Sequence, residues 1–185
     1  MGRPKFRLPI AFKTFFLCIV ALIGILSCND DTKDIEINQE PVVSTFYMIR
    51  HAEKDRTDIN DKNPELNQKG LDRAIRWAEV FDPVVLDAIY STDYKRTSMT
   101  AAPVSVKKDI DIQYYDPSTL DVETFKQDYA GKQVLIVGHS NTTPFLANKL
   151  LGEEKYGNMD DDDNSSLFIV RIIDGKATDM VLKMD

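Results

Sequence analysis

The chain has 185 residues, which fits one domain of ordinary size plus a processed end. Hydrophobic residues make up 43% and charged residues 29%, which predicts a globular protein that buries a core. The net charge of -7 and the isoelectric point near 4.9 argue against nucleic acid as the main partner, because such binders usually carry a basic face. A small anionic ligand is not excluded, since a few arginines in a cleft can reverse the local field.

The amino-terminal segment predicts an export signal. An unbroken apolar run at 15–26 has the length of a signal-peptide core and is shorter than the roughly 20 residues of a membrane-spanning helix. Cys28 follows it in "ILSCND" and resembles the lipidated cysteine of the bacterial lipoprotein lipobox, although Leu26 is bulkier than the usual residue there. A plain signal peptide and an uncleaved anchor are the alternatives. The basic residues that precede the run are Arg3, Lys5, Arg7 and Lys13.

These features divide the chain into three expected parts. Residues 1–27 are predicted to be a lipoprotein signal peptide, 28–41 a flexible acidic tether, and 42–185 the folded domain. The protein is therefore expected to be anchored to a membrane through a lipid on Cys28 and to face the periplasm or the cell surface. The other cysteine, Cys18, lies within the signal, so no disulfide, thiol nucleophile or cysteine metal site is expected in the domain.

From residue 42 onward, short apolar runs alternate with amphipathic stretches. The helix expected at 67–81 begins at a plausible N-cap, Asn67, and the strand expected at 133–139 is apolar almost throughout, which is typical of a strand covered on both faces. The other strands are expected at 44–50, 86–92, 110–115, 165–173 and 177–184, and the other helices at 93–104, 121–130 and 142–152. Helical spacing predicts a buried face on 67–81 made of Leu71, Ala74, Ile75, Ala78 and Phe81.

Strands that alternate with helices predict a three-layer α/β fold, with a mostly parallel sheet and helices on both faces. In such sheets, ligands bind beyond the carboxyl ends of the strands. The chain has 2 histidines, and each of them, His51 and His139, comes at the carboxyl end of a predicted strand. We therefore expect both histidines to lie in one site.

The residues around the histidines suit the transfer of a phosphoryl group. Arg50 and Arg96 offer forked donors that match phosphate oxygens. One histidine, neutral at one ring nitrogen, can attack phosphorus, and the other, when protonated, can neutralise charge on the equatorial oxygens. Ser140 and Asn141 stand at a helix start, where free backbone N–H groups favour an anion. Together these groups predict a phosphoryl-transfer pocket that uses no metal and no cofactor.

Other interpretations of the same residues are weaker. A histidine at a strand end is often structural, and a zinc pair lacks a regularly spaced third ligand such as that of an HExxH helix. Serine hydrolase chemistry at "GHSNT" lacks the G-x-S-x-G pattern. The acidic run at 160–163 could bind calcium, but it lacks the spaced ligands and the glycine of a calcium loop, so a solvated loop is favoured.

Several segments, taken in order, resemble the motifs of the histidine phosphatase superfamily, which has the phosphoglycerate mutase-like fold. They are "RHAEK", "PELNQKGLDRA", "YSTDYKRTSMTA" and "VLIVGHSNTTP". The resemblance implies that His51 is the nucleophile that becomes phosphohistidine, and that Arg50, Arg96 and His139 clamp the transferred phosphoryl group. Ala52 stands where many members have glycine, which is a slight departure.

The general acid is the least defined part of this site. Hydrolysis of an ordinary phosphomonoester needs a proton for the leaving alkoxide, and many members of the superfamily supply it from a carboxylate between the clamp arginine and the second histidine. Asp116, just after the third predicted strand, is preferred here over Asp121 and Glu123, although an Asp before Pro117 also commonly forms a turn. Without an acid, the chain would resemble the short phosphohistidine phosphatases. The expected contacts at the rim of the site are Lys54, Ser140 and Asn141.

The leading prediction is a metal-independent phosphatase, tethered to a membrane outside the cytoplasm, that acts on a small phosphomonoester or on a phosphoprotein. Little sequence separates Arg96 from His139, which leaves no room for a large cap domain and disfavours the acid phosphatase and phytase branch. The alternatives are a phosphoglycerate-type mutase, a protein phosphohistidine phosphatase and a catalytically silent phosphate-binding lipoprotein.

Overall fold

The computed structural model describes residues 40–184. The predicted signal peptide, Cys28 and the tether up to residue 39 lie outside the described residues. The unit Glu40–Asp185 contains all of the predicted site residues other than Cys28. No helix within residues 40–184 combines the length and the apolar character needed to cross a membrane.

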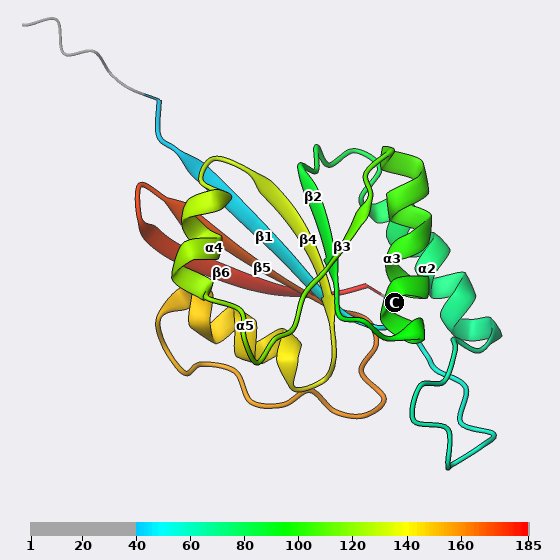
Figure 1. The fold of residues 1–185 in the computed structure, drawn as a ribbon. Helices are drawn as coiled ribbons and strands as arrows, with labels where there is room; N and C mark the ends of the chain where they lie inside the picture. The colour runs from blue at the N-terminus through cyan, green and yellow to red at the C-terminus, as the bar shows by residue number, and fades with distance from the viewer. Residues whose placement is uncertain (1–39, 185) are drawn as a thin grey trace, which may run out of the picture. The chain divides into compact units, whose positions relative to one another are not determined.

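A six-stranded sheet forms the centre of this unit, in the order β3-β2-β4-β1-β5-β6 (Figure 1). The pairs β1–β4, β4–β2 and β2–β3 are parallel, whereas β5 pairs antiparallel with both β1 and β6. The predicted mixed α/β fold with a mostly parallel sheet is confirmed. The strands are β1 (Val43–Arg50), β2 (Ala88–Ser91), β3 (Ile112–Tyr114), β4 (Gln133–Gly138), β5 (Ser166–Ile173) and β6 (Lys176–Lys183).

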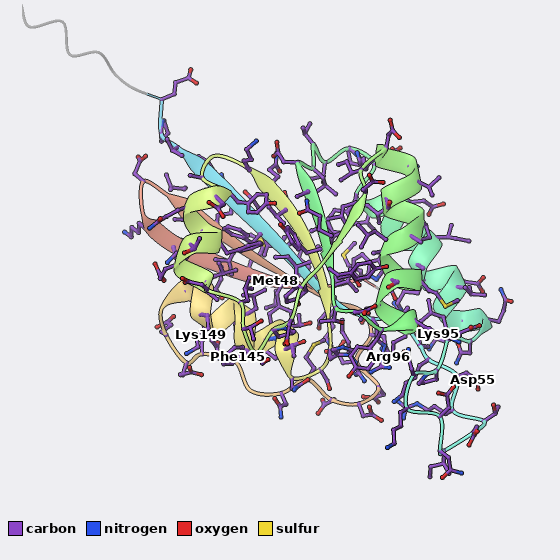
Figure 2. All side chains as sticks on the ribbon, viewed as in Figure 1. Met48, Asp55, Lys95, Arg96, Phe145 and Lys149 are labelled. Atoms are coloured by element: carbon purple, nitrogen blue, oxygen red, sulfur yellow. The ribbon has the colours of Figure 1, made fainter. Side chains whose placement is uncertain are left out.

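Helices pack on both faces of the sheet because the side chains of β1 alternate between two cores. Phe46 and Met48 belong to one core, with the helices α4 and α5, and Met48 lies at the middle of the sheet in Figure 2. Ile49 belongs to the other core, where it packs with Trp77 of α2 and with α3. Full burial of a side chain of this size stabilises the fold by about 1.5–3 kcal/mol. The helices are α2 (Gln68–Val80), α3 (Lys95–Lys108), α4 (Val122–Asp128) and α5 (Thr142–Leu151).

The pairing of β1 with β4 sets the relative position of the two histidines. Arg50 lies opposite Gly138 in the register, and the backbone N–H of His51 donates to the carbonyl oxygen of Gly138 at 2.9 Å. The two parallel strands therefore end at the same level, and His51 and His139 leave the sheet side by side. The expectation that they share one edge of the sheet is confirmed.

Helix α2 turns a different face to the core from the one that apolar spacing predicted. Gly70 and Arg73 are buried, whereas Leu71 and Ile75 are 37% and 54% exposed. The cause is the segment that follows β1: Gly70 packs against the backbone of Glu53, and Nε of Arg73 donates to both carboxylate oxygens of Glu53. The remaining residues of the predicted face are buried as expected: Ala74, Ala78 and Phe81.

Helix α3 also differs from its predicted bounds. It begins at Lys95, later than expected, because the hydroxyl of Thr97 donates to the carbonyl oxygens of Thr92 and Tyr94 and closes a turn before the helix. It continues past Pro103, which was expected near the end. A proline removes its own backbone donor, but the packing of the remaining residues keeps this helix intact. The delayed start leaves the residues after β2 free to line the sheet edge.

Gly70→Ala is expected to destabilise the domain. A Cβ at this position would lie 2.1 Å from the carbonyl oxygen of Glu53, so α2 or the segment after β1 would have to move. Overpacking of this kind costs about 1–3 kcal/mol, which should lower the midpoint of thermal unfolding. Gly157→Ala is the matched control, because a Cβ there meets no atom within 4 Å. Equal midpoints for the two variants would contradict the close approach.

Candidate active site

The carboxyl ends of β1, β2 and β4 open into a cavity of about 1050 Å³. Arg96 and Phe145, near the amino ends of α3 and α5, both lie at this end of the sheet (Figure 2). The structure brings the predicted site residues together around this cavity, while their chemical roles stay predictions. Its lining includes Arg50, His51, Lys54, Arg96, Asp116, His139, Ser140 and Asn141.

His51 is buried and held in one tautomer. Its Nδ1 lies 2.8 Å from the carbonyl oxygen of Ala52, which can only accept, so Nδ1 carries the proton and Nε2 keeps its lone pair. Burial lowers the pKa of His51 to about 3, helped by the cations Arg50 and Arg96 and opposed by the bond to Ala52. The ring is therefore neutral at neutral pH, with a nitrogen available as a nucleophile. Asn164 fixes the backbone by donating to the carbonyl oxygen of His51 at 2.8 Å.

His139 faces His51 edge to face, with ring centroids 5.4 Å apart. Its Nε2 lies 2.9 Å from the hydroxyl of Thr92, and its backbone N–H donates to the hydroxyl of Thr142 at 2.9 Å. Burial lowers the pKa of His139 to about 4, and Arg96, Arg50 and Lys54 lower it further. His139 is therefore neutral at neutral pH in this arrangement, and its expected role as a protonated ring beside a phosphoryl group stays a prediction. An anion bound beside it would reverse this field and raise its pKa.

Both arginines present unused donors. The side chain of Arg50 is 3% exposed, and its Nε has no partner within residues 40–184. Nε and Nη1 of Arg96 are likewise buried without a partner in this part of the chain. A buried unsatisfied donor costs about 1–3 kcal/mol, more when it is charged, so such groups are usually paired. Their presence at a cavity beside two neutral histidines indicates a binding site for an anion.

Tyr94 supports the second arginine and the second histidine at once. Its ring lies under the guanidinium of Arg96, whose Cζ is 4.4 Å from the ring centroid, and it meets the ring of His139 edge-on at 5.0 Å. Such a cation–π contact contributes about 0.5–2 kcal/mol and limits the orientations of the arginine. Sequence reasoning missed both Tyr94 and Thr92, although they lie within the quoted segment "YSTDYKRTSMTA". Their position directly after β2, at the edge that carries the arginine, was the available signal.

Asp116 lines the cavity, but its carboxylate is already engaged in a turn. Oδ1 accepts from the backbone N–H and from the hydroxyl of Ser118, and these bonds hold the pKa of Asp116 below its usual range. The group is therefore ionised at neutral pH in this arrangement. The other two acid candidates do not line the cavity: Asp121 caps α4, and Glu123 pairs with Lys126.

The sequence suggested that the acidic run 160–163 is a solvated loop, but part of this loop also contacts the candidate site. Asp161 is 72% exposed, but it forms ion pairs with Arg50 at 3.0 Å and with Arg56 at 2.9 Å. The loop thus reaches the candidate site across a large sequence separation, which no local pattern could have indicated. Within residues 40–184, no three His, Cys, Asp or Glu side chains are grouped so that they could hold a metal ion.

Comparison with known proteins finds similarity to histidine phosphatases. Residues 46–117 match the model of the histidine phosphatase superfamily (branch 1). No curated protein matches the chain. The protein histidine phosphatase SixA, solved with tungstate, is similar with a TM-score of 0.61 and 15% identity, over 75% of this chain and 96% of that chain. The native structure of a mycobacterial glucosyl-3-phosphoglycerate phosphatase is similar with a TM-score of 0.58 and 13% identity. The match covers 77% of this chain and 100% of that chain.

The comparisons establish the fold of the described residues. The architecture is the phosphoglycerate mutase-like fold of histidine phosphatases, and a cavity lined by His51 and His139 lies at the carboxyl ends of its parallel strands. Residues 46–117, less than half of the chain, match the model of the histidine phosphatase superfamily, and the resemblance stated from the motifs is supported to that extent.

Proposed function

We propose that this protein is a metal-independent phosphatase that hydrolyses phosphomonoesters through a phosphohistidine at His51. Nε2 of His51 attacks phosphorus, and the bond from phosphorus to the leaving oxygen breaks as the P–N bond forms. The leaving oxygen takes a proton from solvent or from a general acid and departs as the alcohol. Water then attacks the phosphohistidine, the P–N bond breaks, and inorganic phosphate leaves. The observation that carries the proposal is the set of unpaired donors on Arg50 and Arg96 beside an imidazole with a free Nε2.

The expected role of the arginines follows from the charge of the transferred group. Charge spreads over the equatorial oxygens of the phosphoryl group during transfer, and preorganised donors in a site shielded from water stabilise it most. Buried donors that are already in place need no reorganisation when the charge develops. The names of the similar structures, a protein histidine phosphatase and a glucosyl-3-phosphoglycerate phosphatase, agree with this reaction class.

The state of Asp116 favours a second candidate, a phosphatase for phosphohistidine in proteins. An ionised carboxylate cannot give a proton to a leaving alkoxide. A phosphoramidate leaves as a nitrogen base that needs less help, so a site whose Asp116 is held ionised by Ser118 suits it better. The two candidates share the nucleophile and the clamp and differ only in the leaving group.

We also propose that the domain acts outside the cytoplasm, tethered to a membrane through a lipid on Cys28. This rests on the basic segment, the apolar run 15–26 and the cysteine that follows. The tether can be tested by growing bacteria that produce the full chain with a radioactive fatty acid and measuring the label on the purified protein. The Cys28→Ser variant should carry no label. A labelled Cys28→Ser protein would contradict the tether.

Asp116→Asn separates the two leaving-group classes. With EDTA present, the full chain in mild detergent is expected to release phosphate from p-nitrophenyl phosphate and from a histidine-phosphorylated peptide. If Asp116 is no acid, the variant should keep both rates within about twofold, as is usual for an exposed polar substitution. A selective loss on an alkyl phosphate such as glycerol phosphate would instead assign Asp116 as the proton donor. Absence of release from all three substrates would contradict the proposed function.

A further inference from the structure

The acidic loop 160–163 occupies one side of the clamp arginine. Nη1 of Arg50 donates to the carbonyl oxygens of Asp160 at 2.7 Å and of Asp163 at 3.2 Å. Nη2 of Arg50 donates to Oδ1 of Asp161 at 3.0 Å, which is the only charged acceptor of the three. The other carboxylate oxygen of Asp161 lies 2.9 Å from Nη1 of Arg56, so this carboxylate bridges two guanidinium groups.

The same guanidinium needs its Nη2 for an anion in the cavity. Nε–H and the Nη2 on the same side form the fork that binds a carboxylate or a phosphate with two parallel bonds. Nε of Arg50 is buried and without a partner in the described part of the chain, so this half of the fork is open. Asp161 already accepts a hydrogen bond from Nη2, the nitrogen that supplies the other half. Asp161 and a phosphoryl group bound at Nε would therefore both accept hydrogen bonds from Nη2 of Arg50.

The charges around the cavity make this competition strong. Lys54 and Arg96 line the same cavity as Arg50, and all three carry positive charge. Asp161 is the carboxylate of this lining that pairs directly with Arg50, and hydrogen bonds from Arg56 and Arg50 lower its pKa to about 2, so it is ionised at neutral pH. A dianion that enters the cavity meets both an occupied donor and a fixed negative charge.

We propose that Asp161 is an internal counter-anion of the phosphoryl site, which holds Nη2 of Arg50 when the site is empty and gives it up when phosphate enters. The inference rests on the proposed function, since it concerns regulation of the same site. Arg56, whose side chain is 56% exposed, can keep its ion pair with the Asp161 carboxylate after Arg50 has released it. The consequence is a lower affinity for phosphate, and hence faster release of the product.

Asp161 is not required to place Arg50. The arginine belongs to β1, and two backbone carbonyl groups of the loop hold its Nη1 whether or not residue 161 carries a charge. A variant without the negative charge should therefore keep the arginine in position and weaken the hold on its Nη2. A scaffold role for Asp161 predicts the opposite, because loss of a support would weaken the site.

Binding of inorganic phosphate to the full chain, in mild detergent, tests the proposal by isothermal titration calorimetry. Asp161→Asn is expected to bind phosphate about three- to tenfold more tightly than the wild type. Arg50 no longer has an ion pair with residue 161 that phosphate must replace, and the screened repulsion between that carboxylate and phosphate is gone. Asp161→Glu, which keeps the charge, should stay near the wild type. With p-nitrophenyl phosphate, Asp161→Asn should lower KM, whereas a structural defect would lower kcat without tightening binding.

Asp162→Asn is the matched control. It makes the same change in net charge, in the same loop, and the carboxylate of Asp162 makes no ion pair within residues 40–184. Its phosphate affinity should equal that of the wild type. Unchanged or weaker binding by Asp161→Asn, or equal tightening by both variants, would overturn the inference while leaving the proposed function standing. Failure of all the proteins to bind phosphate would overturn both.

Discussion

His51→Ala is expected to reduce phosphate release by at least about a thousandfold, because the variant loses the atom that forms the covalent intermediate. The backbone carbonyl of Ala52 fixes the tautomer of this imidazole, which leaves Nε2 unprotonated in a residue that lines the cavity. The measurement is the initial rate of p-nitrophenyl phosphate hydrolysis with EDTA present. In the variant, water would have to attack the phosphomonoester directly, which is much slower than attack by a positioned imidazole.

The buried position of His51 calls for a control on folding. His51 is 4% exposed, so alanine leaves a small cavity that could lower stability. Thermal unfolding and phosphate binding should both be measured on the variant, because Arg50 and Arg96 remain in place to bind the anion. A folded variant that binds phosphate and still turns over at a tenth or more of the wild-type rate would refute His51 as nucleophile.

Arg96→Ala is expected to lower kcat/KM by about a hundredfold or more, since removal of one donor aimed at developing charge typically costs that much. Two nitrogens of Arg96 are buried and unpaired, and the ring of Tyr94 fixes the guanidinium plane. Arg96→Lys should recover only part of the loss, because a lysine is a point charge without the planar fork. Tyr94 remains as the platform in both variants.

Lys95→Gln provides the control for Arg96. It removes one positive charge at the neighbouring position, but Lys95 pairs with Glu65 at 3.0 Å on the surface and does not line the cavity. Its kcat/KM should stay within about twofold, as is usual for an exposed ion pair. Equal losses for the two positions would mean that the overall field, and not the fork of Arg96, governs the rate.

The sequence predicted the parts of the site that depend on regular structure. Apolar runs located β1 and β4, and parallel strands end at one edge, so the proximity of His51 and His139 followed without knowledge of any contact. The arginine after β2 could be placed by the same rule. These inferences hold because side-chain periodicity and strand direction are local properties of the chain.

The rest depended on contacts between distant segments. Leu71 and Ile75 are apolar at the correct spacing, yet the pairing of Arg73 with Glu53 rotates α2 and leaves them exposed. The bond between Arg50 and Asp161 joins the end of β1 to a loop far away in sequence. Whether Asp116 holds a proton depends on the turn it forms with Ser118, which composition and spacing do not determine.

The most direct test of the central claim is to trap the phosphoenzyme. The full chain is mixed with p-nitrophenyl phosphate, quenched in alkali and digested, and the peptide that contains residue 51 is analysed by mass spectrometry. The account predicts one phosphoryl group on His51, stable in alkali and lost in acid, and none on His139. A catalytically active protein that never carries phosphate on His51, or that carries it on another residue, would contradict the mechanism.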